Sequence, residues 1–295
     1  MSTDVLSTRQ VAQLLGVGEA TVKRWADAGE IDCFRTPGGH RKFRLRDVTA
    51  FVQARRYQAA GPVPAQLPEG KSGVEFTERF QKLALAGSID DCVAMLAALR
   101  LRGPALEELF DDVVTPALIG IGLGWERGEL SVAEEHVAAQ TVIDAIARSQ
   151  PLAEPPGEPV RPGRGVAVVA AVAGELHDIA PRMAACLLRA RGFEVLAPLA
   201  QTPARDMAEL ILRSRAALVL LSSTMPLNPA TIAEQVDLAA SAVQQTGGHL
   251  LIGGGGMKKV NLPAGVKLIS SMRELAAESE TAGRQRPKLR PSPRP

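Results

Sequence analysis

The pattern of apolar and polar positions is clearest in the last third of the chain. Residues 166–172 form a continuous apolar run, as a buried parallel strand requires, and similar runs recur at 193–199, 217–221 and 249–252. Segments with helical periodicity, at about 178–191, 204–214 and 228–245, separate these runs. Strands that alternate with helices predict a doubly wound, flavodoxin-like Rossmann domain over residues 165–280.

The middle of the chain has the period of α-helices throughout. Helices are predicted at 74–86, 88–101, 104–124 and 131–148, with Ser88 and Pro104 at favourable N-terminal positions. Short connections favour antiparallel neighbours, so residues 74–153 are expected to form a four-helix bundle.

The N-terminal segment predicts a helix-turn-helix. Ser7 or Thr8 can cap a first helix, Gly16-Val17-Gly18 makes a tight turn, and a second helix carries Val22 and Trp25 inward. The second helix of such a motif enters the major groove of DNA. Its outward residues, which are the candidates for contacts with bases and phosphates, are Glu19, Thr21, Lys23 and Arg24.

A basic hairpin follows this motif. Its Gly38-Gly39 turn and flanking residues resemble the wing of MerR-type regulators, as does the sequence RTPGGHRKF followed by RDVTAFVQARR. The resemblance implies a winged helix-turn-helix that binds double-stranded operator DNA, with phosphate contacts from the wing. The wing residues expected to contact DNA are Arg35, His40, Arg41 and Lys42.

Two Pro- and Gly-rich stretches separate these parts. The predicted organisation is therefore a DNA-binding domain at 1–57, a linker at 58–73, the bundle at 74–153, a linker at 154–164, the Rossmann domain at 165–280, and a basic Pro-rich tail at 281–295.

Composition and charge agree with this division. Of the 295 residues 46% are hydrophobic and 22% charged, as in globular proteins, and residues 1–57 carry ten Lys and Arg against six Asp and Glu. The sequence has no apolar run of bilayer length and no signal peptide at its start, so we expect a cytoplasmic protein without a membrane partner. Three isolated cysteines predict neither a disulfide framework nor a zinc site.

His177 differs from the other three histidines because it follows the first buried strand, where open α/β sheets bind ligands. Its loop resembles the DxHxxG signature of cobalamin-binding Rossmann domains, with Glu175 for the Asp and Ala180 for the Gly. The resemblance implies that His177 is the cobalt ligand. An acid two residues earlier is suited to hold the second ring nitrogen.

Two further strand ends add to this resemblance. Ser222-Ser223-Thr224 is similar to the family's SxL, with Ser222 and Thr224 as the matching positions, and Gly253 and Gly254 are similar to its glycine pair. These small residues imply a slot for the nucleotide tail of cobalamin. The glycine run does not match the motifs that bind dinucleotides or triphosphates.

The bundle carries a third motif. Trp125, Glu135 and His136 resemble the W-x9-EH motif of the CarH/LitR light-responsive regulators, in which the bundle covers the upper face of cobalamin. The resemblance implies a repressor, not an enzyme, that binds adenosylcobalamin in the dark, forms a homotetramer on its operator and dissociates in light. The family's photosensors commonly have His after this Trp. Here Glu126 is a weaker cobalt ligand, with Arg127 as its expected ion-pair partner, and a bis-His product would require His136.

Three alternatives remain open from the sequence. One is a regulator that senses corrinoid supply, redox state or another tetrapyrrole without a light switch. Another is a cobalamin-carrying enzyme subunit, which would need a further substrate domain. The third is a cofactor-free regulator with a vestigial cage, indicated by Glu126, Ala180 and Thr224.

Overall fold

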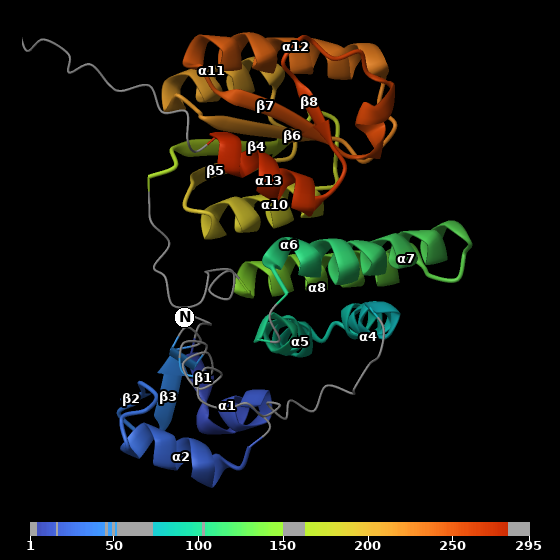
Figure 1. The fold of residues 1–295 in the computed structure, drawn as a ribbon. Helices are drawn as coiled ribbons and strands as arrows, with labels where there is room; N and C mark the ends of the chain where they lie inside the picture. Colours follow the sequence, from blue (N-terminus) through green and yellow to red (C-terminus); the bar gives the residue numbers. More distant parts are fainter. Residues whose placement is uncertain are drawn as a thin grey trace, which may run out of the picture. The chain divides into compact units, whose positions relative to one another are not determined.

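The computed structural model describes residues 5–15, 17–44, 47–48, 51, 73–101, 104–149 and 163–282 (Figure 1). The chain forms two compact units, Met1–Arg161 and Pro162–Pro295. Most of both predicted linkers and of the basic tail lies outside the described residues. In the part of the chain that is described, every helix is too short or too polar to span a bilayer.

The first unit begins with the predicted winged helix-turn-helix. Its elements are β1 (Val5–Ser7), α1 (Thr8–Leu15), α2 (Glu19–Asp27), β2 (Phe34–Arg35) and β3 (Arg41–Arg44). Ser7 caps α1, since its Oγ accepts a hydrogen bond from the Gln10 amide at 3.3 Å while Gln10 Oε1 accepts from the Ser7 amide at 2.8 Å. Val22 is buried, and the Trp25 ring packs on Phe51 with 4.8 Å between centroids, so the predicted inward face of α2 is confirmed.

The wing is an antiparallel hairpin, as predicted. β2 pairs with β3, with Phe34 opposite Lys42 and Arg35 opposite Arg41, and β1 pairs with the other edge of β3. Gly39 has a φ of +78°, which a glycine adopts at little cost, and its amide donates to the Thr36 carbonyl at 2.8 Å. The hairpin therefore closes at its Gly-Gly turn.

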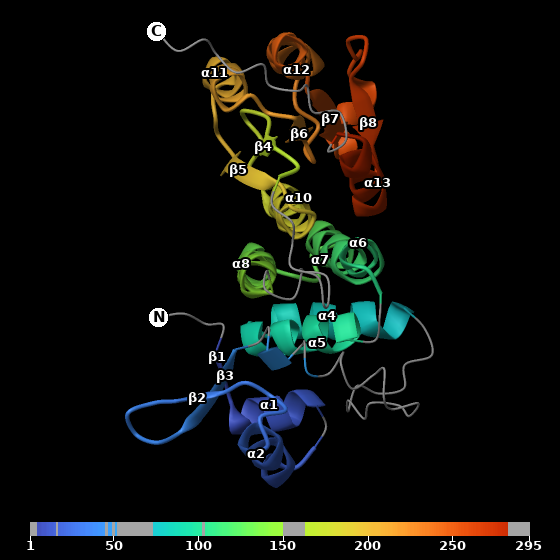
Figure 2. The same ribbon diagram turned by 60° about the vertical axis from the view of Figure 1, so that its left-hand side comes forward.

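Four helical segments follow in the first unit. They are α4 (Gly73–Leu85), α5 (Ile89–Leu101), the run of α6 (Leu106–Leu109), π-helix η1 (Phe110–Val114) and α7 (Thr115–Glu126), and α8 (Val132–Arg148). Ser131 and Glu134 form a capping box at the start of α8, where Ser131 Oγ accepts from the Glu134 amide at 3.2 Å. The predicted bundle is present, but α4 and α5 run across α7 and α8 instead of alongside them (Figures 1 and 2).

The second unit is the predicted doubly wound domain. Its strands are β4 (Val166–Ala171), β5 (Glu194–Leu199), β6 (Leu218–Ser222), β7 (His249–Gly253) and β8 (Lys267–Ile269), and its α-helices are α10 (Ile179–Ala190), α11 (Ala204–Ser214), α12 (Pro229–Thr246) and α13 (Met272–Ala282). All strands are parallel, in the order β5-β4-β6-β7-β8. α10 and α13 cover one face of the sheet, and α11 and α12 cover the other (Figures 1 and 2).

This strand order determines where a ligand can bind. Within this unit the chain runs from β4 to β5 on one side of β4, and then returns to β6 on the other side of β4. The connections after β4 and β6 therefore leave in opposite directions, and the crevice between them at the carboxyl edge is the switch point at which open α/β sheets bind ligands. Glu175 and His177 follow β4 at this edge, and Ser223 and Thr224 follow β6.

Candidate functional site

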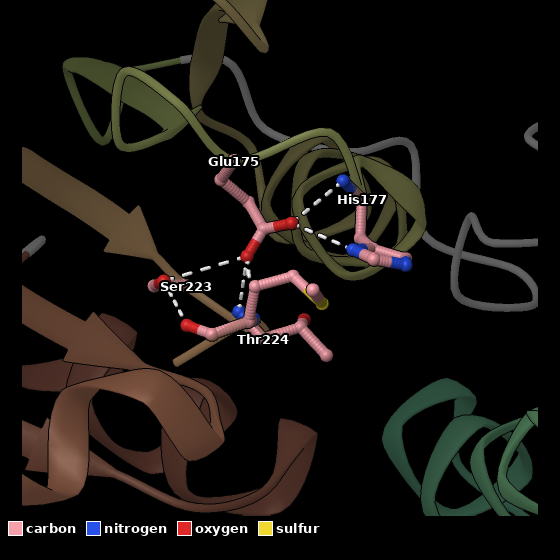
Figure 3. Close-up of polar contacts among 5 residues, drawn as sticks. Glu175, His177, Ser223 and Thr224 are labelled. Atoms are coloured by element: carbon pink, nitrogen blue, oxygen red, sulfur yellow. Dashed lines mark hydrogen bonds and ion pairs between the residues drawn. The ribbon is translucent and has the colours of Figure 1, made fainter. Parts of the chain in front are cut away.

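The loop between β4 and α10 carries an acid and an imidazole with opposite environments. It turns at Gly174, whose φ of +92° is unfavourable for residues with a side chain. The Glu175 side chain is completely buried, whereas that of His177 is 51% exposed. The loop therefore holds a carboxylate inside the domain and presents an imidazole at its surface (Figure 3).

One carboxylate oxygen of Glu175 fixes His177. Oε1 accepts a hydrogen bond from the His177 backbone amide at 2.8 Å and lies 2.7 Å from Nδ1 of the ring. This contact confirms the predicted acceptor. It favours the tautomer with the proton on Nδ1, which leaves the Nε2 lone pair to bind a metal.

The other oxygen of Glu175 reaches the loop after β6. Oε2 accepts hydrogen bonds from the Thr224 amide at 2.6 Å and the Met225 amide at 2.7 Å, and Ser223 Oγ lies 3.4 Å away (Figure 3). Burial alone would raise the pKa of Glu175, but the hydrogen bonds from His177, Met225 and Thr224 hold that pKa below its ordinary value. Glu175 is thus an ionised link between the two loops at the switch point.

Gln235, on α12, holds the start of the same loop. Its Oε1 accepts from the Ala173 amide at 2.6 Å, and its Nε2 donates to the Ala173 carbonyl at 3.3 Å. The sequence reasoning missed this residue. The available signal was a polar side chain on a helix face that is otherwise buried and apolar, beside Ile232 and Val236.

The serine hydroxyl that contacts Glu175 belongs to Ser223, the second serine of the predicted motif. Ser222 is the buried last residue of β6, and Ser223 Oγ both contacts Glu175 and donates to the Met225 carbonyl at 3.0 Å. Thr224 contributes its backbone amide, while the residue itself is exposed. Ser223-Thr224-Met225 is therefore the segment that meets the acid, one residue later than the sequence match indicates.

The glycines after β7 allow two loops to approach closely. A Cβ on Gly254, whose φ is +94°, would lie 2.2 Å from the Ser223 carbonyl oxygen, and one on Gly256 would lie 2.2 Å from that of Met225. Gly253 ends β7 and is buried. The space beside Gly254 is thus filled by backbone and is not an open slot. The glycines support the loop that contacts Glu175.

The side chains at this edge fit a metal ion that is already coordinated within a cofactor and takes one further ligand from the protein. They provide one imidazole whose Nδ1 is held by a buried carboxylate, as metal-ligating histidines usually are. Such a pair suits an axial position on a macrocycle-bound metal. The described ranges contain no group of three or more His, Cys, Asp or Glu side chains that could hold a metal ion.

The motif residues of the bundle lie at its surface. Trp125, in the last turn of α7, is 48% exposed, so it does not belong to the bundle core. His136 is exposed near the start of α8, with its Nε2 3.6 Å from Glu135 Oε2. Large apolar side chains are also exposed on these two helices, namely Ile119, Leu123, Val132 and Val137.

The expected pair between Glu126 and Arg127 is replaced by another. Arg127 donates two hydrogen bonds to Glu129, from Nε to Oε1 and from Nη2 to Oε2, each at 2.8 Å. This fork geometry occupies both carboxylate oxygens. Glu126 is exposed at the end of α7.

The predicted DNA contacts differ in their exposure. Lys23 and Arg24 are exposed on α2, as are Arg35 and His40 on the wing, whereas Thr21 and Lys42 are half-buried. Arg41 is different because its side chain is only 18% exposed and forms an ion pair with Asp27 of α2. Of the predicted basic contacts, Lys23, Arg24 and Arg35 are thus the exposed ones.

Comparison with known families supports both parts of this description. Residues 5–56 match a model described as a helix-turn-helix domain, and residues 77–149, which contain the bundle, match one described as a B12 binding domain. The chain is thus a helix-turn-helix protein with a B12-binding domain. The prediction of a helix-turn-helix domain together with a B12-binding domain is confirmed.

Two curated relatives are transcriptional repressors. The HTH-type transcriptional repressor CarH of Myxococcus xanthus is 26% identical over 245 residues, which are 72% of this chain and 76% of that protein. The transcriptional repressor DcmR of Methylorubrum extorquens is 33% identical over 111 residues, which are 36% of this chain and 41% of that protein.

A solved structure has a similar fold over most of the chain. The monomethylamine corrinoid protein of Methanosarcina barkeri matches 71% of this chain and 100% of its own with a TM-score of 0.56. At 12% identity this likeness shows the fold alone. The predicted fold class, a helix-turn-helix followed by a helical bundle and a parallel α/β domain, is confirmed.

Proposed function

We propose that the chain is a transcriptional repressor that binds operator DNA through residues 1–57 and cobalamin through residues 74–153 and 165–280. The observation that carries the cofactor assignment is the contact of 2.7 Å between His177 Nδ1 and Glu175 Oε1 at the switch point of the sheet. The helix-turn-helix match favours a regulator over a cobalamin-carrying enzyme subunit. A function on operator DNA also favours a cytoplasmic protein.

In this proposal His177 would hold the cobalt of cobalamin. Its Nε2 would bind cobalt, and Glu175 would keep the imidazole oriented and its Nδ1 proton in place. When bound, cobalamin supplies a cobalt centre whose upper ligand can be exchanged or lost. Of the predicted residues at the ends of β6 and β7, the exposed Thr224 is proposed to contact the nucleotide tail, whereas Ser222, Gly253 and Gly254 would shape the edge beside it.

The bundle residues would contact the upper ligand. Trp125 offers an exposed aromatic face, which suits a flat organic group, and Glu135 and His136 offer hydrogen-bonding side chains. The match of residues 77–149 to a B12 binding domain supports this role. An adenosyl group satisfies both kinds of contact, so adenosylcobalamin is the proposed form.

The proposed signal is light, read as a change in oligomeric state. The motif resemblance supports a MerR-type photoreceptor that is a homotetramer on DNA in the dark and dissociates on illumination. The similarity to the repressor CarH supports transcriptional repression. Glu126 favours a second candidate, a sensor of corrinoid supply, redox state or another tetrapyrrole. A carboxylate there is a harder, weaker cobalt ligand than imidazole.

A binding experiment distinguishes these candidates. The full chain, loaded with adenosylcobalamin in darkness, selects duplexes from a random-sequence pool. The affinity for the selected duplex is then measured before and after green illumination, with hydroxocobalamin-loaded protein as the control. A loss of binding upon illumination, together with a smaller particle in sedimentation, is expected. DNA binding that requires cobalamin but does not change on illumination would support the second candidate. Selection of the same duplexes with and without cobalamin would contradict both candidates.

A further inference from the structure

Alternate residues of β3 face opposite sides of the wing. Phe43 is completely buried in the core that α1 and α2 help to form, so Arg41, two residues earlier, faces the helices as well. Lys42 and Arg44 face the opposite side, where the Arg44 guanidinium lies 5.9 Å from the centroid of the Phe34 ring. Arg41 is thus the basic residue of β3 directed toward α2, the helix expected to enter the major groove, which is called the recognition helix below.

The position of Arg41 is unfavourable without a counter-charge. It is paired directly with Arg35 in the antiparallel register, and like charges in such pairs are destabilising. Asp27 is equally unfavourable alone, since it is the last residue of α2 and an acid at a helix C-terminus opposes the helix dipole. The ion pair between Arg41 and Asp27 compensates both costs and joins the wing to the recognition helix.

We infer that Arg41 is a positioning residue, which sets the wing beside the recognition helix through Asp27, and that it does not bind a phosphate of the DNA. This inference rests on the proposed DNA binding. It leaves phosphate neutralisation on the α2 side of the wing to the exposed Lys23, Arg24 and Arg35.

The inference reverses the expected effect of removing an acid. A DNA-binding protein that loses a negative charge near its DNA surface normally binds DNA more tightly, because DNA is a polyanion. If Asp27 holds the wing in place, Asp27→Asn weakens operator binding although it makes the domain more basic. Asp32→Asn is the matched control, because Asp32 is an exposed acid five residues after Asp27, in the connection between α2 and β2.

The test uses the full chain and a duplex selected by the natural protein from a random pool. Asp27→Asn and Arg41→Gln are each expected to weaken binding about fivefold, as for loss of an ion pair in a partly exposed setting, with the slope of log affinity against log salt unchanged. Asp32→Asn is expected to bind at least as tightly as the natural chain. The charge-reversed pair, Asp27→Arg with Arg41→Asp, is expected to recover binding to within twofold.

Opposite results would overturn the inference. Tighter binding by Asp27→Asn, or a salt slope lowered by about one unit in Arg41→Gln, would identify Arg41 as a phosphate ligand. A charge-reversed pair that binds more weakly than either single variant would do the same. Circular dichroism of every variant reports folding, and the reversed pair separates loss of the ion pair from loss of fold. If the natural chain selects no duplex, the proposed DNA binding fails instead.

Discussion

The imidazole of His177 and the buried carboxylate of Glu175 form one hydrogen-bonded unit, with 2.7 Å between Nδ1 and Oε1. The same carboxylate accepts hydrogen bonds from the Thr224 and Met225 amides. The orientation of the imidazole is therefore tied to the backbone of the loop after β6. A substitution of Glu175 or in the loop after β6 is therefore expected to alter the orientation of His177, the proposed metal ligand.

Replacing Glu175 with Gln tests this link. Glutamine has nearly the same size, but one of its two terminal groups is a donor and would face either His177 Nδ1 or the amides of the β6 loop. We expect cobalamin affinity, measured by absorption titration, to fall about 10- to 100-fold, as for other partners of metal-ligating histidines. Glu194→Gln, at an exposed acid of β5, is the control. An affinity within twofold of the natural value would show that Glu175 does not orient the ligand.

Glycine 254 is expected to be irreplaceable for steric reasons. In Gly254→Ala the new Cβ would lie 2.2 Å from the Ser223 carbonyl oxygen, so backbone must move, whereas Gly265 has a similar φ of +85° and open space around its Cβ position. We expect Gly265→Ala to lower the free energy of unfolding by about 1 kcal/mol through backbone strain alone. Gly254→Ala is expected to cost more than twice as much in denaturant unfolding. Equal losses would mean that the loops separate easily.

Trp125 is expected to matter for the ligand and little for the fold. Because its side chain is 48% exposed, Trp125→Ala should change the thermal unfolding temperature only slightly. We expect it to weaken binding of adenosylcobalamin more than binding of hydroxocobalamin, which has a small upper ligand. Leu123→Ala, which shortens another exposed side chain of α7, is the control. Equal losses for both cobalamins would remove Trp125 from the upper-ligand site.

Glu280 predicts a pH dependence of stability. Hydrogen bonding to Arg164 is the main reason that the pKa of this carboxyl lies below its ordinary value, and the charges of Arg164 and Arg191 also lower it. A carboxyl whose pKa is lowered by folding stabilises the fold above its unfolded pKa, and this contribution is lost as pH falls through the folded pKa. The stability difference between the natural chain and Glu280→Gln should therefore be well under 1 kcal/mol at pH 7, because the pair is partly exposed, and should vanish in acid. A difference that grows toward low pH would contradict this.

Most of the fold could be predicted because the buried strands and helices leave clear apolar patterns in the sequence. The runs at 166–172 and 217–221 are buried on both sheet faces, so their sequences are continuously apolar and match β4 and β6 closely. β8 gives no such signal, since Lys267 and Leu268 are exposed in a strand of three residues. The spacing of apolar residues also does not distinguish the π-helix η1 from the α-helices on either side of it.

The site could be predicted only where its contacts are local. Glu175 and His177 lie on one loop, so their spacing already indicates their contact. The contact of Glu175 with Ser223 joins loops that follow different strands, and its register depends on where β6 ends. Counting charges likewise places Arg41 on a basic surface, but only the wing register shows that it faces Asp27.

The most direct test of the central claim is the identity of the atom below cobalt. The chain is produced with 15N-labelled histidine, loaded with unlabelled cobalamin, reduced to the Co(II) form and examined by electron paramagnetic resonance. If His177 Nε2 binds cobalt, each cobalt line should split into the doublet of one 15N nucleus, and His177→Ala should lose that doublet. A 14N triplet in the labelled natural chain would show that cobalamin keeps its own base, which would contradict the account.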